Sequence, residues 1–135
     1  MRTLNKILPA VILVSMFFLV SFAQEEGGWD VPEKYKTMKN PTEDSKRNMK
    51  IGKMLYAKHC KSCHGNQGLG DGPKAASLET FPGDFSSEAF QSQTDGELYY
   101  KTTFGRDEMP AYESTIPSDE DRWLIVHYMR TFTRE

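Results

Sequence analysis

The pentapeptide Cys60-Lys61-Ser62-Cys63-His64 holds the only two cysteines of this 135-residue chain. Two thiols three residues apart share one turn of the chain, so each can add to one of the two vinyl groups of a porphyrin. The histidine that follows directly is then placed under the iron as its proximal ligand. The pentapeptide therefore predicts one haem bound covalently through Cys60 and Cys63, with His64 on the iron.

Three other interpretations of the two cysteines stay open at this point. A redox disulfide of the Cys-x-x-Cys type belongs at a strand-to-helix junction, and no such pattern surrounds this pair. Structural zinc needs four ligands, and the other two histidines, His59 and His127, lack zinc-finger spacing. A plain structural disulfide is compatible with a location outside the cytoplasm.

The segment before the pentapeptide has the apolar spacing of a helix. Ile51, Met54 and Leu55 fall at i, i+3 and i+4, which predicts an amphipathic helix from about Glu43 to His59. Residues 65–83 are rich in glycine and proline and indicate a loop with at most one helical turn. The helix therefore delivers Cys60 at its C-terminal end.

Two further helices are predicted from their start signals. Thr94 and Glu97 form a capping box for a helix that ends at Gly105. Ser118 caps the last helix, whose first turn carries three carboxylates that suit the helix dipole. No pattern indicates a strand hairpin, so the fold class is all-α, with one domain.

Around the pentapeptide, several features occur in the order typical of class I c-type cytochromes, and the chain resembles that family, in its bacterial soluble type, over about residues 48–132. They are Gly52 and Tyr56, Cys60 to His64, Gly72-Pro73, Met109-Pro110, and Trp123 with Tyr128. The resemblance implies a small fold of three to four helices wrapped around one haem c. It also implies that Gly52 lies where the first and last helices cross, and that the carbonyl of Pro73 accepts a hydrogen bond from the proximal histidine.

Met109 is the candidate for the sixth iron ligand. It lies in a polar loop next to Pro110, at the place where the resemblance implies the axial methionine, whereas the other methionines after residue 23 lie in the lead-in or on helices. His59 is expected to face away from the haem, and His127 belongs to the last helix. A thioether favours ferrous iron, and six ligands in both oxidation states suit electron transfer. Arg106, Tyr99 and Trp123 are weak candidates for donors to the haem propionates.

The N-terminus has the pattern of an export signal. A basic start is followed by an uncharged apolar run and small residues before Gln24, which predicts a signal peptide over residues 1–23, or an anchor in the cytoplasmic membrane if it is retained. Residues 24–47 are expected to form an extended arm, and residues 48–135 the cytochrome c domain. Cleavage would leave 15 basic and 19 acidic groups, so nothing indicates nucleic-acid binding.

The charges are segregated along the chain. Nine Lys or Arg and three acids occupy residues 33–61, whereas six and thirteen occupy residues 65–135. A charge dipole of this kind can orient a protein on a charged partner.

Together these features predict a periplasmic one-electron carrier of a respiratory chain, with no substrate chemistry of its own. Its partners would be membrane or periplasmic oxidoreductases, with membrane contact only if the leader is retained. One alternative is a haem c subunit of a larger membrane oxidoreductase complex. The other is a haem sensor or peroxidase, which requires the bond between Met109 and the iron to be labile.

Overall fold

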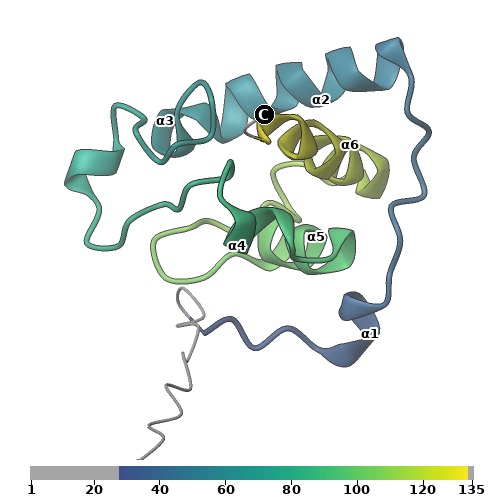
Figure 1. Cartoon of the computed structure of the whole chain (residues 1–135), viewed down its shortest axis with the longest axis horizontal. Helices are drawn as coiled ribbons and strands as arrows, with labels where there is room; N and C mark the ends of the chain where they lie inside the picture. Colours follow the sequence, from purple (N-terminus) through teal and green to yellow (C-terminus); the bar gives the residue numbers. More distant parts are fainter. Residues whose placement is uncertain (1–27, 134–135) are drawn as a thin grey trace, which may run out of the picture.

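All regular elements among residues 28–133, the part described by the computed structural model, are helical. The first four are α1 (Glu33–Lys36), α2 (Lys46–His59), α3 (Lys61–His64) and the 3-10 turn η1 (Ala75–Ser77). The others are α4 (Glu88–Gln91), α5 (Asp95–Phe104), α6 (Asp119–Met129) and the 3-10 turn η2 (Arg130–Phe132). The predicted all-α class is confirmed (Figure 1). The predicted signal peptide lies outside the described residues.

Serine and threonine caps determine where the long helices begin. The capping box of α5 is present, with Thr94 and Glu97 each accepting from the other's backbone N–H. Ser118 caps α6 through the backbone N–H of Asp121. α2 begins at Lys46, three residues after the predicted Glu43, because the Ser45 side chain accepts from the N–H of Asn48 and its extended backbone stops the helix there.

α2 and α6 cross at close range, as the resemblance implied (Figure 1). A Cβ atom on Gly52 would lie 2.2 Å from the backbone oxygen of Leu124 and 3.1 Å from the Cβ of Tyr128. The crossing therefore leaves no room for a side chain at Gly52, which explains a glycine inside a helix.

Replacing Gly52→Ala is expected to destabilise the folded protein by about 1–3 kcal/mol. A methyl group driven against the Leu124 carbonyl must push the helices apart, which outweighs the roughly 1 kcal/mol that alanine gains over glycine in helix propensity. Chemical unfolding of the haem-loaded protein measures the change. Lys53→Ala, at an exposed position of the same helix, is the control and should stay within about 0.5 kcal/mol of the wild type. An unchanged unfolding midpoint for the Gly52 variant would contradict the packing argument.

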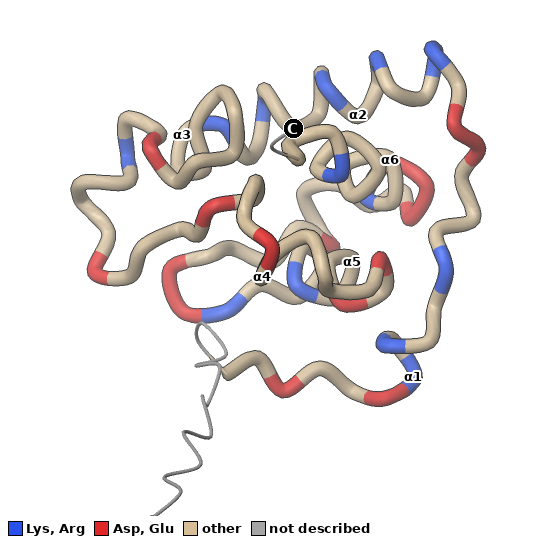
Figure 2. The backbone as a smooth tube through the Cα atoms, viewed as in Figure 1, with Lys and Arg blue, Asp and Glu red and all other residues tan. Residues whose placement is uncertain are grey.

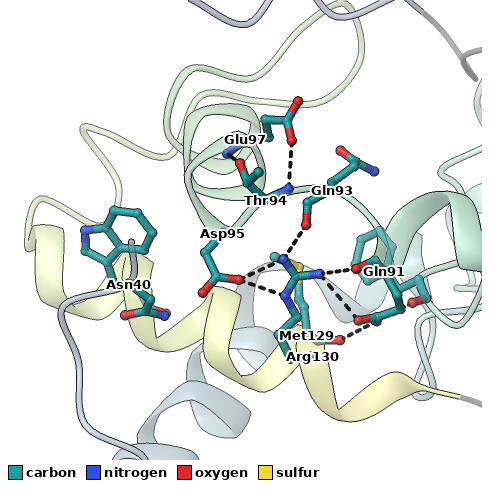
Figure 3. A network of polar contacts seen from close by, with 10 residues as sticks. Asn40, Gln91, Gln93, Thr94, Asp95, Glu97, Met129 and Arg130 are labelled. Atoms are coloured by element: carbon teal, nitrogen blue, oxygen red, sulfur yellow. Dashed lines mark hydrogen bonds and ion pairs between the residues drawn. The ribbon is translucent and has the colours of Figure 1, made fainter. Parts of the chain in front are cut away.

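The C-terminal end of α6 is joined to the start of α5 by one arginine. The Arg130 guanidinium donates to the Asp95 carboxylate at 2.8 Å and to the backbone oxygens of Gln91 at 2.9 Å and Gln93 at 2.6 Å (Figure 3). Gln91 in turn donates to the Met129 oxygen at 3.1 Å. This network fixes α4, α5 and α6 as a unit beneath α2.

Residues 28–45 run along the outside of this unit and hold to it at several points. The backbone oxygen of Tyr35 lies so close to α5 that a Cβ on Gly96 would come within 1.8 Å of it. The Tyr35 ring lies 4.8 Å from that of Tyr100, and the Asn40 amide donates to the Trp123 oxygen at 3.0 Å. Within residues 28–133, no helix combines the length and apolar character that crossing a membrane requires.

Candidate haem-binding site

The end of α2 and the loop after α3 fix the attachment pentapeptide. The Cys60 N–H donates to the Tyr56 oxygen at 2.8 Å, and the Tyr56 hydroxyl donates to the Gly65 oxygen at 2.8 Å. The chain then returns across α3, where the Gly72 N–H donates to the Cys63 oxygen at 3.1 Å. The pentapeptide is therefore held from both sides by backbone contacts.

A cavity of about 130 Å³ opens beside the pentapeptide. Cys60, Cys63, His64 and Met109 all line it, so the structure brings all four predicted site residues to one place. The remaining lining residues are Trp29, His59, Leu78, Thr80, Phe81, Pro82, Arg106, Asp107, Glu108, Pro110 and Tyr112. A smaller cavity, lined by Cys60, His64, Met109 and Met129 among others, adjoins it on the inside.

The His64 imidazole is partly buried and uncharged at neutral pH. Burial lowers its pKa to about 4, and the backbone of Pro82 opposes this in part. The ring nitrogen Nδ1 is buried and has no hydrogen-bond partner. His64 thus carries a neutral ring, the form in which a histidine binds metal.

The resemblance implied a hydrogen bond from the proximal histidine to the Pro73 carbonyl, and the described part of the chain shows no such bond, since Nδ1 of His64 has no partner. Pro73 is exposed, beside a turn in which the Lys74 N–H donates to the Ser62 oxygen at 2.8 Å. The backbone that acts on the pKa of His64 is that of Pro82, which lines the cavity.

Cys60 and Cys63 form no disulfide with each other. Cys60 is 7% exposed, and burial, with a smaller effect from Cys63, raises the pKa of its thiol to about 12. Addition to a vinyl group requires reduced sulfur, and this turn of the chain presents two such sulfurs to one cavity.

Reciprocal backbone hydrogen bonds close the loop that carries Met109. Arg106 and Met109 each donate to the other at 2.9 Å. The turn between them has a positive φ angle of 52° at Asp107, and Gly105 directly before it has one of 60°. The Tyr112 hydroxyl further ties this region to the attachment helix by donating to the His59 oxygen at 2.6 Å.

A carboxylate fastens the same loop to a second segment beside the cavity. Glu108 accepts from the backbone N–H groups of Glu79 at 2.9 Å and Thr80 at 3.1 Å. Because Thr80 and Glu108 both line the cavity, this contact joins two segments of its lining. Neither this contact nor the roles of Tyr112 and Phe85, whose ring lies 4.4 Å from that of His64, had a local signal in the sequence.

The other two histidines and the candidate propionate donors differ in how well they match their expected places. His59 was expected to face away from the haem, yet it lines the cavity with its ring 5.9 Å from that of Tyr112. Of the propionate candidates, only Arg106 lines the cavity. Tyr99 and Trp123 stack on each other in the core at 4.0 Å. His127 lies on the last helix, α6, as expected, and pairs with Asp44 at 3.3 Å.

This set of residues fits haem c. Two cysteine sulfurs, a neutral imidazole and a thioether meet at one cavity, and Nδ1 of the imidazole is buried without a partner. A buried polar atom without a partner costs about 1–3 kcal/mol and indicates that the site is completed by another group. His64 would bind the iron, and Cys60 and Cys63 would form the two thioether bonds.

Comparisons with known proteins agree with this chemistry. The family described as cytochrome c oxidase, cbb3-type, subunit III, matches residues 47–129. A thiosulfate dehydrogenase from Stutzerimonas stutzeri (strain A1501) is 30% identical over 84 residues, which cover 62% of this chain and 27% of that protein. The chain thus spans about a quarter of the length of this curated relative.

Two solved structures resemble the chain. One is the Kuenenia stuttgartiensis reducing HAO-like protein complex Kustc0457/Kustc0458, with a TM-score of 0.63 and 30% identity over 70% of this chain and 47% of that chain. The other is the KustC0563 c-type cytochrome, with a TM-score of 0.53 and 25% identity over 62% of this chain and 98% of that chain. The predicted small cytochrome c fold is confirmed. The chain is a class I c-type cytochrome and belongs to the family of cytochrome c oxidase, cbb3-type, subunit III.

Proposed function

We propose that this cytochrome carries one electron at a time on a single haem c, bound through Cys60 and Cys63 and ligated by His64 and Met109. The observation that carries the proposal is the meeting of these four side chains at one cavity. Haem supplies the ferric–ferrous couple when bound. The protein supplies two neutral ligands, His64 and Met109, and the cavity lining around them.

The contacts of the Met109 loop suit a ligand that stays in place in both oxidation states. Backbone hydrogen bonds between Arg106 and Met109 close the loop, and Glu108 fastens it to the backbone N–H groups of residues 79 and 80. Such tethers limit how far the thioether moves when the charge on the iron changes. Little rearrangement on electron transfer is the property that a carrier needs.

An enzyme or sensor would instead need an open position on the iron and a polar group aimed at it. Charged residues do line the cavity beside Met109. Arg106 is engaged by Asp107 at 3.2 Å, and Glu108 by two backbone N–H groups. These contacts favour the carrier over the sensor or peroxidase, even though the chain resembles part of a thiosulfate dehydrogenase.

We further propose that the protein is exported to the periplasm and exchanges electrons with membrane or periplasmic oxidoreductases there. The export pattern of residues 1–23 supports the location. The exposed face of α2 carries five basic side chains and no acid, whereas most acids lie on the other segments (Figure 2). A field of this shape orients the protein on a charged partner.

A second candidate is a haem c subunit of a larger membrane oxidoreductase complex. It is favoured by the likeness to a chain from a multi-protein complex, of which this chain covers 47%. In that case the haem-stained protein from its native membrane or periplasm would run with other chains under non-denaturing conditions, whereas a free carrier would run alone.

Spectroscopy and mass measurement of the purified wild-type protein test the carrier. The intact mass should exceed that of the polypeptide by one haem, and the haem should resist extraction with acidified acetone. The ferric form should be low-spin with the weak long-wavelength absorption of iron–thioether ligation, and the ferrous form should not bind carbon monoxide at neutral pH. Ready carbon monoxide binding would overturn the carrier in favour of a sensor or peroxidase.

A further inference from the structure

The arm before α2 contributes a lining residue to the cavity, although the arm lies outside the segment that matches the family. The family match covers residues 47–129, whereas Trp29 lines the cavity together with Met109. Val31, two residues further on, is only 5% exposed. This end of the arm is therefore packed against the cytochrome domain at the site.

Trp29 contacts Arg106, the first residue of the loop that carries the proposed ligand Met109. The guanidinium carbon of Arg106 lies 4.5 Å from the centroid of the Trp29 ring, and the Lys101 ammonium lies 5.7 Å from it. Both distances fall within the range of cation–π attraction, for which indole is the best of the aromatic rings. The ring thus attracts two cations, one from α5 and one from the loop that follows it.

The constraint on Arg106 reaches Met109 through the backbone. Arg106 and Met109 are joined by two hydrogen bonds of 2.9 Å. A Cβ on Gly105 would lie 2.4 Å from the Met109 oxygen, so the turn has little space in which to deform. A displacement of Arg106 therefore displaces the Met109 backbone as well.

We propose that Trp29 is a positioning residue for the Met109 ligand, holding the loop closed through Arg106 and covering the cavity on that side. This rests on the proposed ligation by Met109. The arm can transmit such a restraint because its own position is fixed, by the Tyr35 backbone against Gly96 and by the Asn40 bond to α6. In this protein the resistance of the sixth ligand to displacement depends on a segment outside the family's shared fold.

The test is the rate at which imidazole binds to the ferric full-length protein, because imidazole enters only when the thioether leaves. Trp29→Ala should raise that rate on the order of tenfold, since the closed loop loses its cation–π contacts. Trp29→Phe keeps an aromatic face, so its imidazole binding rate should lie between those of the wild type and Trp29→Ala. Met38→Ala, on the same arm but not lining the cavity, is the control and should match the wild type.

A double-mutant cycle shows whether Trp29 acts through Arg106. Combining Trp29→Ala with Arg106→Gln should raise the rate no further than the larger single effect. Equal imidazole rates in wild type, Trp29→Ala and Trp29→Phe, with the thioether absorption intact in all three, would overturn the proposal and leave the carrier function standing. If the wild type itself lacks the thioether absorption, the ligation by Met109 is wrong and the role of Trp29 falls with it.

Discussion

Replacing Met109→Ala is expected to convert a closed haem into one that binds carbon monoxide readily in its ferrous form. The thioether absorption should disappear from the ferric spectrum because no sulfur remains on that side of the iron. The reduction potential should fall by on the order of 0.1 V, within the roughly 0.8 V over which axial ligands set haem potentials, because the soft sulfur stabilises ferrous iron. Optical titration and spectroelectrochemistry measure these three changes.

Met129 is the rival thioether and supplies the control for this experiment. It is 4% exposed and lines the smaller inner cavity together with His64 and Met109. Met129→Leu should keep the absorption and the potential of the wild type, because leucine matches the volume of methionine and Met129 only fills the core. Loss of the thioether absorption in Met129→Leu, with its retention in Met109→Ala, would show that Met129 is the iron ligand.

Replacing both Cys60→Ala and Cys63→Ala is expected to leave no haem that survives acidified acetone and to leave less than about half of the chain folded. A domain of this size has a small core, and the haem would supply much of the apolar surface packed in it. Haem staining after denaturing electrophoresis reports the covalent bond, and circular dichroism reports the helices.

Ser62→Ala provides the matched control between the two cysteines. It changes the same turn of the chain but neither predicted thioether, and the backbone oxygen of Ser62 still accepts from Lys74. This variant should therefore stain for haem and fold as the wild type does. A double cysteine variant with fully retained, acetone-resistant haem would show that attachment uses other groups.

Local chemistry explains which features were predictable. The capping box at Thr94 and the serine cap at Ser118 act within one helical turn, so the sequence alone places those helix starts. The helix crossing at Gly52 was implied by the family resemblance, and the cost of a glycine inside a helix agreed with it. α4, one turn with Ser87 as its cap, was missed because so short a helix leaves no periodic pattern.

The sequence by itself determined the cofactor chemistry of this protein, because two thiols and an imidazole within five residues need no distant partner to define a haem attachment turn. It also singled out Met109, as the methionine that neither the lead-in nor a predicted helix accounts for. Only the tertiary structure decided what surrounds those groups. The Pro82 backbone acts on His64, Glu108 accepts from the Glu79 N–H, and Arg106 lies over the Trp29 ring. Each of these contacts joins residues at least 18 positions apart, and such contacts depend on how the helices pack rather than on any local pattern.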